Sequence, residues 1–168
     1  YGYAVVEKSD MVFIPDPDTA VIDPFCEIPT LSMTGNAMII DSPENRPLPQ
    51  YPRNIVLAAE KYMSDLGVAD TMLILPEFEF YLFDDVSWDV RTDSMGMTID
   101  AEQAHWNSGV NGKGVIVPKQ KHYHAALPFD RSYDCRSEMC LHMENAGISI
   151  KYHHPEVGGA GQFEVEPK

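Results

Sequence analysis

Short apolar runs separated by Asp, Pro and Gly dominate the first forty residues of the chain. The runs occupy residues 4–6, 11–14, 20–22 and 38–40. Runs of this length, bounded by turn-forming residues, are typical of β-strands joined by short loops. The pattern therefore predicts a small β-rich unit at the N-terminus.

The segment 41–49 separates this unit from the rest of the chain. It contains three prolines in nine residues, a density that is typical of linkers and long loops. We therefore place a domain boundary near residue 48. The chain then divides into an N-terminal domain, 1–48, and a second domain, 49–168.

Two later segments repeat their apolar residues with the period of a helix. The first begins at Pro52, a residue suited to the first helical position, and is ended by Gly67. Its apolar stripe, which we expect to face a core, is Ile55, Val56, Ala59, Tyr62, Met63 and Leu66. A second helix is predicted over 132–146 with Gly147 as its stop. Its inward residues are expected to be Cys135, Met139, Met143 and Ala146.

Residues 72–84 are strand-like, with a possible break at Pro76. Alternation along a strand puts Glu77 and Glu79 on one face and the apolar residues between them on the other. The apolar run that follows, 80–83, favours a central strand over an edge strand. Residues 86–122 are predicted to be mixed loop and short strand.

The last segment, 148–168, is predicted to be a β-hairpin whose turn is the Gly-rich stretch 158–161. Side chains alternate along each arm, so Glu156 shares a face with His154, and Glu164 shares one with Glu166. A loose turn can bring Glu156 and Glu164 together. His153 and His154 point to opposite faces, so at most one of them can join Glu156.

Clustered carboxylates repel one another unless a cation lies between them. Oxygen ligands favour a hard dication such as Mg²⁺ or Mn²⁺, so Glu77, Glu79, Glu156 and Glu164 are the candidate ligands. Two alternatives are open for the acids. Glu77 and Glu79 could belong to a solvated strand face, or a carboxylate pair could hydrolyse a glycosidic bond, which would leave the hairpin pair unused.

Composition narrows the classes of function. The formal net charge is −14, which argues against binding to the phosphate backbone of nucleic acid. Three cysteines provide no disulfide framework and suit a reducing cytosol. No apolar run approaches the roughly 20 residues of a membrane span. The overall pattern is that of a globular α+β protein.

Six segments of the chain, taken in order, resemble bacterial type I glutamine synthetases. Residues 75–85 are similar to the family's signature strand and 153–165 to its second acidic signature, and 9–16 with 19–25 are similar to its N-terminal β-grasp domain. The segments 104–108 and 136–139 fall in the expected order between them. The resemblance implies an α+β fold, with a β-grasp-like unit followed by the first part of a catalytic domain whose curved sheet is antiparallel. It also implies that the chain is a fragment, inactive alone, of a longer synthetase.

The resemblance implies ATP-dependent ligation of ammonia to glutamate through γ-glutamyl phosphate, with two Mg²⁺ or Mn²⁺ ions. The implied roles are as follows: Glu79, Glu156 and Glu164 bind the first ion, Glu77 binds the second ion, Asp10 and Tyr123 belong to the ammonium pocket, and His154 and Lys151 lie at the nucleotide. It further implies a cytoplasmic double-ring dodecamer in which Asp10 serves a neighbouring subunit.

The sequence departs from the family pattern at three places. The run 124–128 replaces a Pro-rich segment, Lys151 stands where a glutamate is common, and Pro155 replaces a histidine. The first departure lies beside the ammonium pocket, so a γ-glutamyl ligase that uses another amine is an alternative. A catalytically inert metal-binding or assembly module is a third hypothesis.

Overall fold

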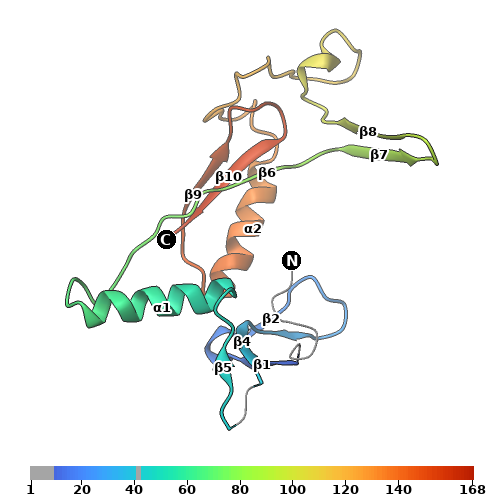
Figure 1. The fold of residues 1–168 in the computed structure, drawn as a ribbon. Helices are drawn as coiled ribbons and strands as arrows, with labels where there is room; N and C mark the ends of the chain where they lie inside the picture. Colours follow the sequence, from blue (N-terminus) through green and yellow to red (C-terminus); the bar gives the residue numbers. More distant parts are fainter. Residues whose placement is uncertain (1–9, 41–42) are drawn as a thin grey trace. The chain divides into compact units, whose positions relative to one another are not determined.

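The computed structural model describes residues 10–40 and 43–168, and the chain forms two compact units, 1–73 and 74–168 (Figure 1). Both units combine helix with antiparallel strands, so the predicted α+β class is confirmed. The boundary near residue 48 and the β-grasp interpretation stay predictions. Within the described part of the chain, no helix has the length and apolar character needed to cross a bilayer.

The N-terminal unit contains two small antiparallel sheets. In the first, β1 (Met11–Pro15), β4 (Gly35–Ile39) and β5 (Arg46–Pro47) lie in the order β1-β4-β5. In the second, β2 (Val21–Ile22) pairs with β3 (Leu31–Ser32), and the short 3-10 helix η2 (Pro17–Thr19) precedes them. The strands predicted over 11–14, 20–22 and 38–40 are confirmed by β1, β2 and β4. The strand predicted over 4–6 lies outside the described residues.

The linker predicted over 41–49 is wrong for its second half. Arg46 and Pro47 pair with β4, and Leu48 is only 3% exposed. The backbone N–H of Leu48 donates to the carbonyl of Ala37 at 3.0 Å. A proline lacks an N–H donor but is tolerated on an edge strand, so proline density alone did not exclude pairing here.

The first helix, α1 (Pro52–Asp65), begins at the predicted proline and is followed by Gly67, whose φ is +65°. The side-chain amide of Asn54 ties the helix to the sheet through the carbonyls of Ala37 (2.8 Å) and Leu48 (3.0 Å). The expected burial of the apolar stripe is wrong within the described residues, since Tyr62 is 66% exposed. Helical periodicity identifies an apolar face but does not identify what covers it.

The C-terminal unit is built on a three-stranded antiparallel sheet. Its strands β6 (Phe78–Tyr81), β10 (Gln162–Pro167) and β9 (Ile150–Pro155) lie in the order β6-β10-β9. Strands β9 and β10 form the predicted C-terminal hairpin. The mixed segment between β6 and the second helix contains the hairpin β7 (Asp85–Val90) and β8 (Met95–Asp100) and the 3-10 helix η3 (His105–Asn107).

The expectation that β6 is a central strand is wrong within the described residues. Strand β6 lies at the edge of the sheet, and Phe78 is 57% exposed. The central strand is β10, where the apolar residues Phe163 and Val165 and the acids that alternate with them, Glu164 and Glu166, are all buried. An apolar run shows that a strand can pack on a face, but it carries no information on how many neighbours the strand has.

The second helix, α2 (Tyr133–Asn145), packs against β9, and Gly147 with a φ of +85° follows it as predicted. Its inward face differs from the prediction. Arg136 and Cys140 are buried, whereas Cys135 is exposed. Met139, Met143 and Ala146 are half-buried. The helix turns a charged side chain inward because Asp130 compensates it, and a count of apolar residues cannot detect such a pair.

Candidate metal centre

The register of the sheet places three ligand-type side chains in one row. Glu164 on the central strand pairs with Glu79 on β6 and with His154 on β9. Residues directly opposite each other on neighbouring strands point to the same face of a sheet. The next row, in which Phe163 pairs with Phe80 and Pro155, therefore lies on the opposite face.

Glu156 joins this row from just beyond the end of β9. Its backbone N–H donates to the carbonyl of Gln162 at 2.9 Å, which closes the hairpin loop. Gly161 in that loop has a φ of +86°, a left-handed conformation that favours glycine. A Cβ at this position would lie 2.5 Å from the carbonyl oxygen of Leu82, so no larger residue fits without displacement.

His154, Glu156 and Glu164 form a compact group of potential ligands. One nitrogen or oxygen from each residue lies within 4.8 Å of the others. The imidazole Nδ1 is 3.7 Å from Glu156 Oε1, and Nε2 is 3.8 Å from Glu164 Oε2. All three residues are buried, at 8%, 7% and 5% exposure. The predicted approach of Glu156 to Glu164 is thus present in the structure.

A second group shares Glu164 and consists of Glu77, Glu164 and Glu166. Glu166 had no role in the sequence-based prediction, although alternation had placed it on this face. Lys151 Nζ lies 3.0 Å from Glu166 Oε2. Hydrogen bonds from Tyr152 and Lys151 lower the pKa of the Glu166 carboxyl, and the bond to Glu166 raises the pKa of Lys151. Glu166 is therefore ionised at neutral pH.

Burial and neighbouring acids make Glu164 hard to ionise. Removal from water, together with a hydrogen bond to Glu156 and the charge of Glu77, raises the pKa of Glu164 to about 7. Little water reaches the buried Glu156 and Glu164 carboxylates to stabilise their negative charge. A bound cation would therefore favour the ionised form of Glu164. A set of carboxylate oxygens with one imidazole suits a six-coordinate dication such as Mn²⁺ or Mg²⁺. The residues present therefore fit a divalent metal.

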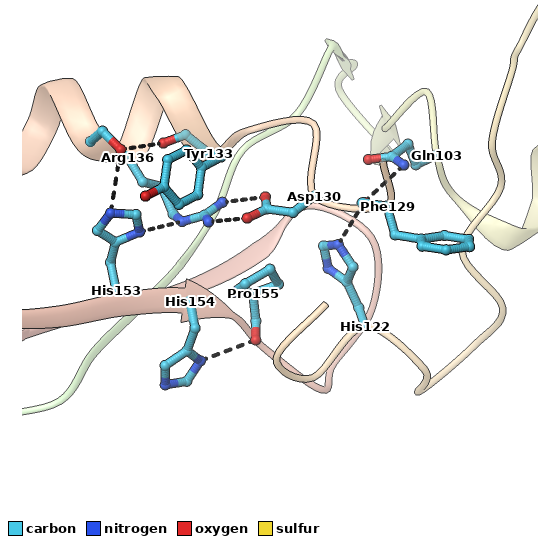
Figure 2. A network of polar contacts seen from close by, with 10 residues as sticks. Gln103, His122, Phe129, Asp130, Tyr133, Arg136, His153, His154 and Pro155 are labelled. Carbon is cyan, nitrogen blue, oxygen red and sulfur yellow. Dashed lines mark hydrogen bonds and ion pairs between the residues drawn. The ribbon is translucent and has the colours of Figure 1, made fainter. Parts of the chain in front are cut away.

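A buried ion pair supports the opposite face of the sheet (Figure 2). Arg136 donates to both carboxylate oxygens of Asp130, at 2.8 and 2.5 Å, and its guanidinium carbon lies 4.5 Å from the centre of the Phe163 ring. Arg136 Nε also donates to His153 Nδ1 at 3.2 Å. Burial and the nearby Arg136 charge lower the pKa of His153. The network fixes the strand residues that flank His154 and Glu164.

Sequence reasoning did not find this network as a structural unit. Arg136 was noted only within a family-like segment, and Asp130 received no role. A charged residue in the first turn of a helix, six residues after an aspartate in a loop, is a weak signal. It becomes informative only when both side chains are known to be buried.

Comparison with known families decides the class of the chain. A sequence model described as the catalytic domain of glutamine synthetase matches residues 49–168. The chain belongs to the glutamine synthetase family. This confirms the resemblance on which the expected residue roles were based.

Curated glutamine synthetases match nearly the whole chain. The chain is 41% identical to the glutamine synthetase of Pasteurella multocida over 98% of its own length and 35% of that protein. It is 39% identical to the Escherichia coli synthetase over the same shares of the two chains. It is also 38% identical, with the same coverage, to a protein named 3-hydroxylaminophenol mutase from Cupriavidus pinatubonensis. The chain thus spans about a third of the length of these relatives.

The fold is also that of a glutamine synthetase. The chain superposes on the cryo-EM structure of the Plasmodium falciparum glutamine synthetase with a TM-score of 0.74 and 20% sequence identity. The match covers 98% of this chain and 33% of the other.

Two residues assigned by family resemblance lie beside the buried group of ligands. The carboxylate of Glu79 accepts a hydrogen bond from Gln162 Nε2 at 2.9 Å, outside both groups described above. The Tyr123 ring is 59% exposed and lies 5.6 Å from the His154 ring in an edge-on arrangement. Their roles as ligand and as ammonium-pocket residue stay predictions.

The other two assigned residues are placed differently. Asp10 is an exposed residue of the N-terminal unit, and its carbonyl accepts a hydrogen bond from the N–H of Ile40 at 3.3 Å. Lys151 is on β9, with its ammonium paired to Glu166 and 4.5 Å from the centre of the Tyr152 ring. Neither placement tests the predicted contacts with ammonium or nucleotide.

Proposed function

We propose that the chain carries part of the active site of an enzyme that makes glutamine from glutamate, ammonia and ATP. Membership of the glutamine synthetase family supports this proposal. The observation that carries it is that two groups of potential ligands share Glu164, one with Glu156 and the other with Glu77, in a row that continues to Glu79. Clustered carboxylates destabilise the fold when no cation is bound, and they form a binding site when one is.

In this proposal the acids divide between two ions. Glu79, Glu156 and Glu164 would hold the ion nearer to glutamate, and Glu77 would help to hold the ion at the ATP phosphates. A bound dication neutralises the charge of the transferred phosphoryl group and orients the reactants. The carboxylates of this chain would hold that positive charge on the sheet formed by β6, β10 and β9.

The reaction then proceeds in two displacements. The γ-carboxylate of glutamate attacks the γ-phosphorus of ATP, and ADP leaves. Ammonia next attacks the carbonyl carbon of the acyl phosphate, and phosphate leaves as the amide forms. Tyr123 and Asp10 are proposed to help bind the ammonium ion, whose proton must be lost before attack. Lys151 and His154 are proposed to lie on the nucleotide side of the centre.

The remaining parts of the proposal concern the whole protein. The N-terminal unit would be a β-grasp domain, and subunits would form a double ring in which Asp10 completes a neighbour's site. We propose a cytoplasmic location, with no nucleic acid or membrane as partner. The chain matches about a third of its relatives' length, so these statements apply to an assembly larger than this chain.

Metal binding can be tested on the chain itself. Calorimetric titration with Mn²⁺ should show binding that is weakened at least tenfold by Glu164→Gln and by Glu79→Gln. Glu138→Gln, which removes an exposed acid on α2, is the matched control and should bind like the parent. A folded chain that does not bind Mn²⁺ would rule out the metal centre.

Catalysis can be tested in a chimera. The chain replaces the matching third of the Pasteurella multocida synthetase, and phosphate release from ATP is measured with glutamate and ammonium. We expect release that depends on all three substrates and is lost with Glu164→Gln but retained with Glu138→Gln. Absence of release from a chimera that binds Mn²⁺ would favour the inert module.

A second candidate is a γ-glutamyl ligase that uses a larger amine. The observation that favours it is the segment 124–128, which departs from the family's Pro-rich run beside Tyr123 and positions His124 against the His154 ring. The family relative named as a mutase also shows that names within the family extend beyond glutamine synthesis. Phosphate release from the chimera with methylamine or a polyamine, and none with ammonium, would establish this candidate.

A further inference from the structure

We propose that a cavity beside the start of α2 and the end of β9 binds a small, neutral aromatic molecule. The cavity has a volume of about 380 Å³, which lies within the range of pockets that bind small molecules. Its lining comes from the loop 124–130, from α2 and from β9. His154 is among the lining residues, but none of the acids of the candidate metal centre is. The inference therefore does not depend on a bound metal ion.

Rings and small apolar residues make up most of the lining. The rings belong to His124, Tyr133, His153 and His154, and the apolar residues are Ala125, Ala126, Leu127 and Pro155. The ring centres of Tyr133 and His153 lie 5.4 Å apart with their planes inclined by 53°, and those of His124 and His154 lie 4.1 Å apart in a stack. The faces and edges of aromatic rings carry opposite partial charges, so they attract a further ring in an offset or edge-on arrangement. An aromatic ligand can therefore make contacts here that a saturated ligand of the same size cannot.

The charged side chains of the lining are paired with each other, which favours a neutral ligand. The guanidinium of Arg136 donates from Nη1 and Nη2 to the two carboxylate oxygens of Asp130, and from Nε to His153 (Figure 2). The side chains of Arg136 and Asp130 are 0% and 3% exposed. Among the described residues, no other carboxylate, ammonium or guanidinium group lines the cavity. A charged ligand would have to break this buried pair or stay without a counter-ion, and both are unfavourable.

Two large side chains of the lining remain in contact with water. Leu127 is 72% exposed and Tyr133 is 49% exposed. A ligand that covers them removes apolar surface from water, which favours binding.

Titration with four matched compounds tests the site on the chain itself. Benzyl alcohol is the neutral aromatic probe, and cyclohexylmethanol is its saturated counterpart. Benzoate and benzylamine add a negative and a positive charge to the same ring. In NMR spectra of chain with ¹³C-labelled histidine, benzyl alcohol should shift the ring signals of His124 and His153 saturably and leave that of the exposed His105 unchanged. The other three compounds should bind at least fivefold more weakly.

A substitution in the lining locates the bound probe. Tyr133→Leu removes one ring and keeps an apolar side chain, so it should weaken the binding of benzyl alcohol at least fivefold. Tyr62→Leu, at an exposed tyrosine of the N-terminal unit, is the matched control and should bind benzyl alcohol like the parent. Far-UV circular dichroism and Mn²⁺ titration of the same samples report separately on the fold and on the metal centre.

The outcomes separate this site from the metal centre. A folded chain without saturable shifts would overturn the inference, whether or not it binds Mn²⁺. Equal affinity for cyclohexylmethanol would show that the rings recognise nothing aromatic, and tighter binding of benzoate or benzylamine would contradict the argument from charge. Unchanged affinity in Tyr133→Leu would place the probe outside the cavity. A chain that binds benzyl alcohol as expected but does not bind Mn²⁺ would support the site and refute the metal centre.

Discussion

The buried ion pair under the sheet leads to a quantitative prediction for Asp130→Asn. The carboxylate of Asp130 accepts two hydrogen bonds from Arg136, and the two side chains are 3% and 0% exposed. Asparagine keeps the shape of the side chain but removes its charge. The guanidinium then remains buried against the Phe163 ring without a counter-ion.

The magnitude follows from that burial. Removal of one partner from a buried ion pair costs about 3–5 kcal/mol, because the other charge loses its compensation and stays out of water. The exposed pair Arg91–Asp89, with side chains 70% and 62% exposed, should contribute less than about 1 kcal/mol. Arg91→Ala in the same compact unit is therefore the matched control.

Urea unfolding provides the measurement. Both tryptophans, Trp88 and Trp106, lie in the unit 74–168, so their fluorescence reports on the unit that contains Asp130. Far-UV circular dichroism, recorded in parallel, reports on both units. The free energy of unfolding is obtained from the midpoint and the slope, and an unchanged slope shows that the variant differs in stability and not in the surface exposed on unfolding.

A loss below about 1 kcal/mol for Asp130→Asn would refute the reasoning, since a buried, uncompensated guanidinium cannot be that inexpensive. The double variant Asp130→Leu with Arg136→Met removes both charges. It should recover most of the stability lost in Asp130→Asn, because no buried charge is left unpaired. A double variant as unstable as the single one would show that packing, and not charge burial, sets the cost.

Three further predictions concern the unit that carries the metal centre. Burial lowers the pKa of His122, so the unfolded chain binds a proton more readily at this residue than the folded chain does. The free energy of unfolding should therefore fall as the pH drops below about 6.5. Urea unfolding from pH 8 to 5 should show a smaller fall for His122→Phe than for the parent chain. Gly161→Ala should destabilise the chain by about 1–3 kcal/mol, because the residue has positive φ and its Cβ would clash with the Leu82 carbonyl; a urea midpoint equal to that of the parent would contradict this. Gln162→Met releases the Glu79 carboxylate from its hydrogen bond, so calorimetry should show a several-fold loss of Mn²⁺ affinity, and unchanged affinity would mean that this bond does not position Glu79.

Local patterns predicted which segments form helices and strands. Pro52 and Gly67 bound α1, and Gly147 follows α2, because these residues act through their own backbone conformations. The Gly-rich turn and the alternation on either side of it likewise predicted the hairpin of β9 and β10. These features depend on neighbours in sequence, so they can be read without knowledge of the tertiary fold.

Patterns were less informative about which face is covered. The apolar stripe of α1 and the apolar run of β6 both suggested burial, yet Tyr62 and Phe78 are exposed in the described chain. The pattern predicted an inward Cys135, and the fold buries Arg136 in its place. Burial depends on which other segments arrive at a surface, and a residue's own periodicity contains no information about them.

The acids that make up the candidate centre were predicted from the sequence, by alternation along strands and by family resemblance. The tertiary structure decided three further features of the centre. It brings Glu166 into the second group of ligands, and it places His154 between Glu156 and Glu164. It also forms the hydrogen bond between Gln162 and Glu79. The physical reason is that alternation depends on neighbours in sequence, whereas the centre is assembled from separate strands. Alternation sets the face to which a side chain points, whereas distances between strands depend on register and on the turn that sets it.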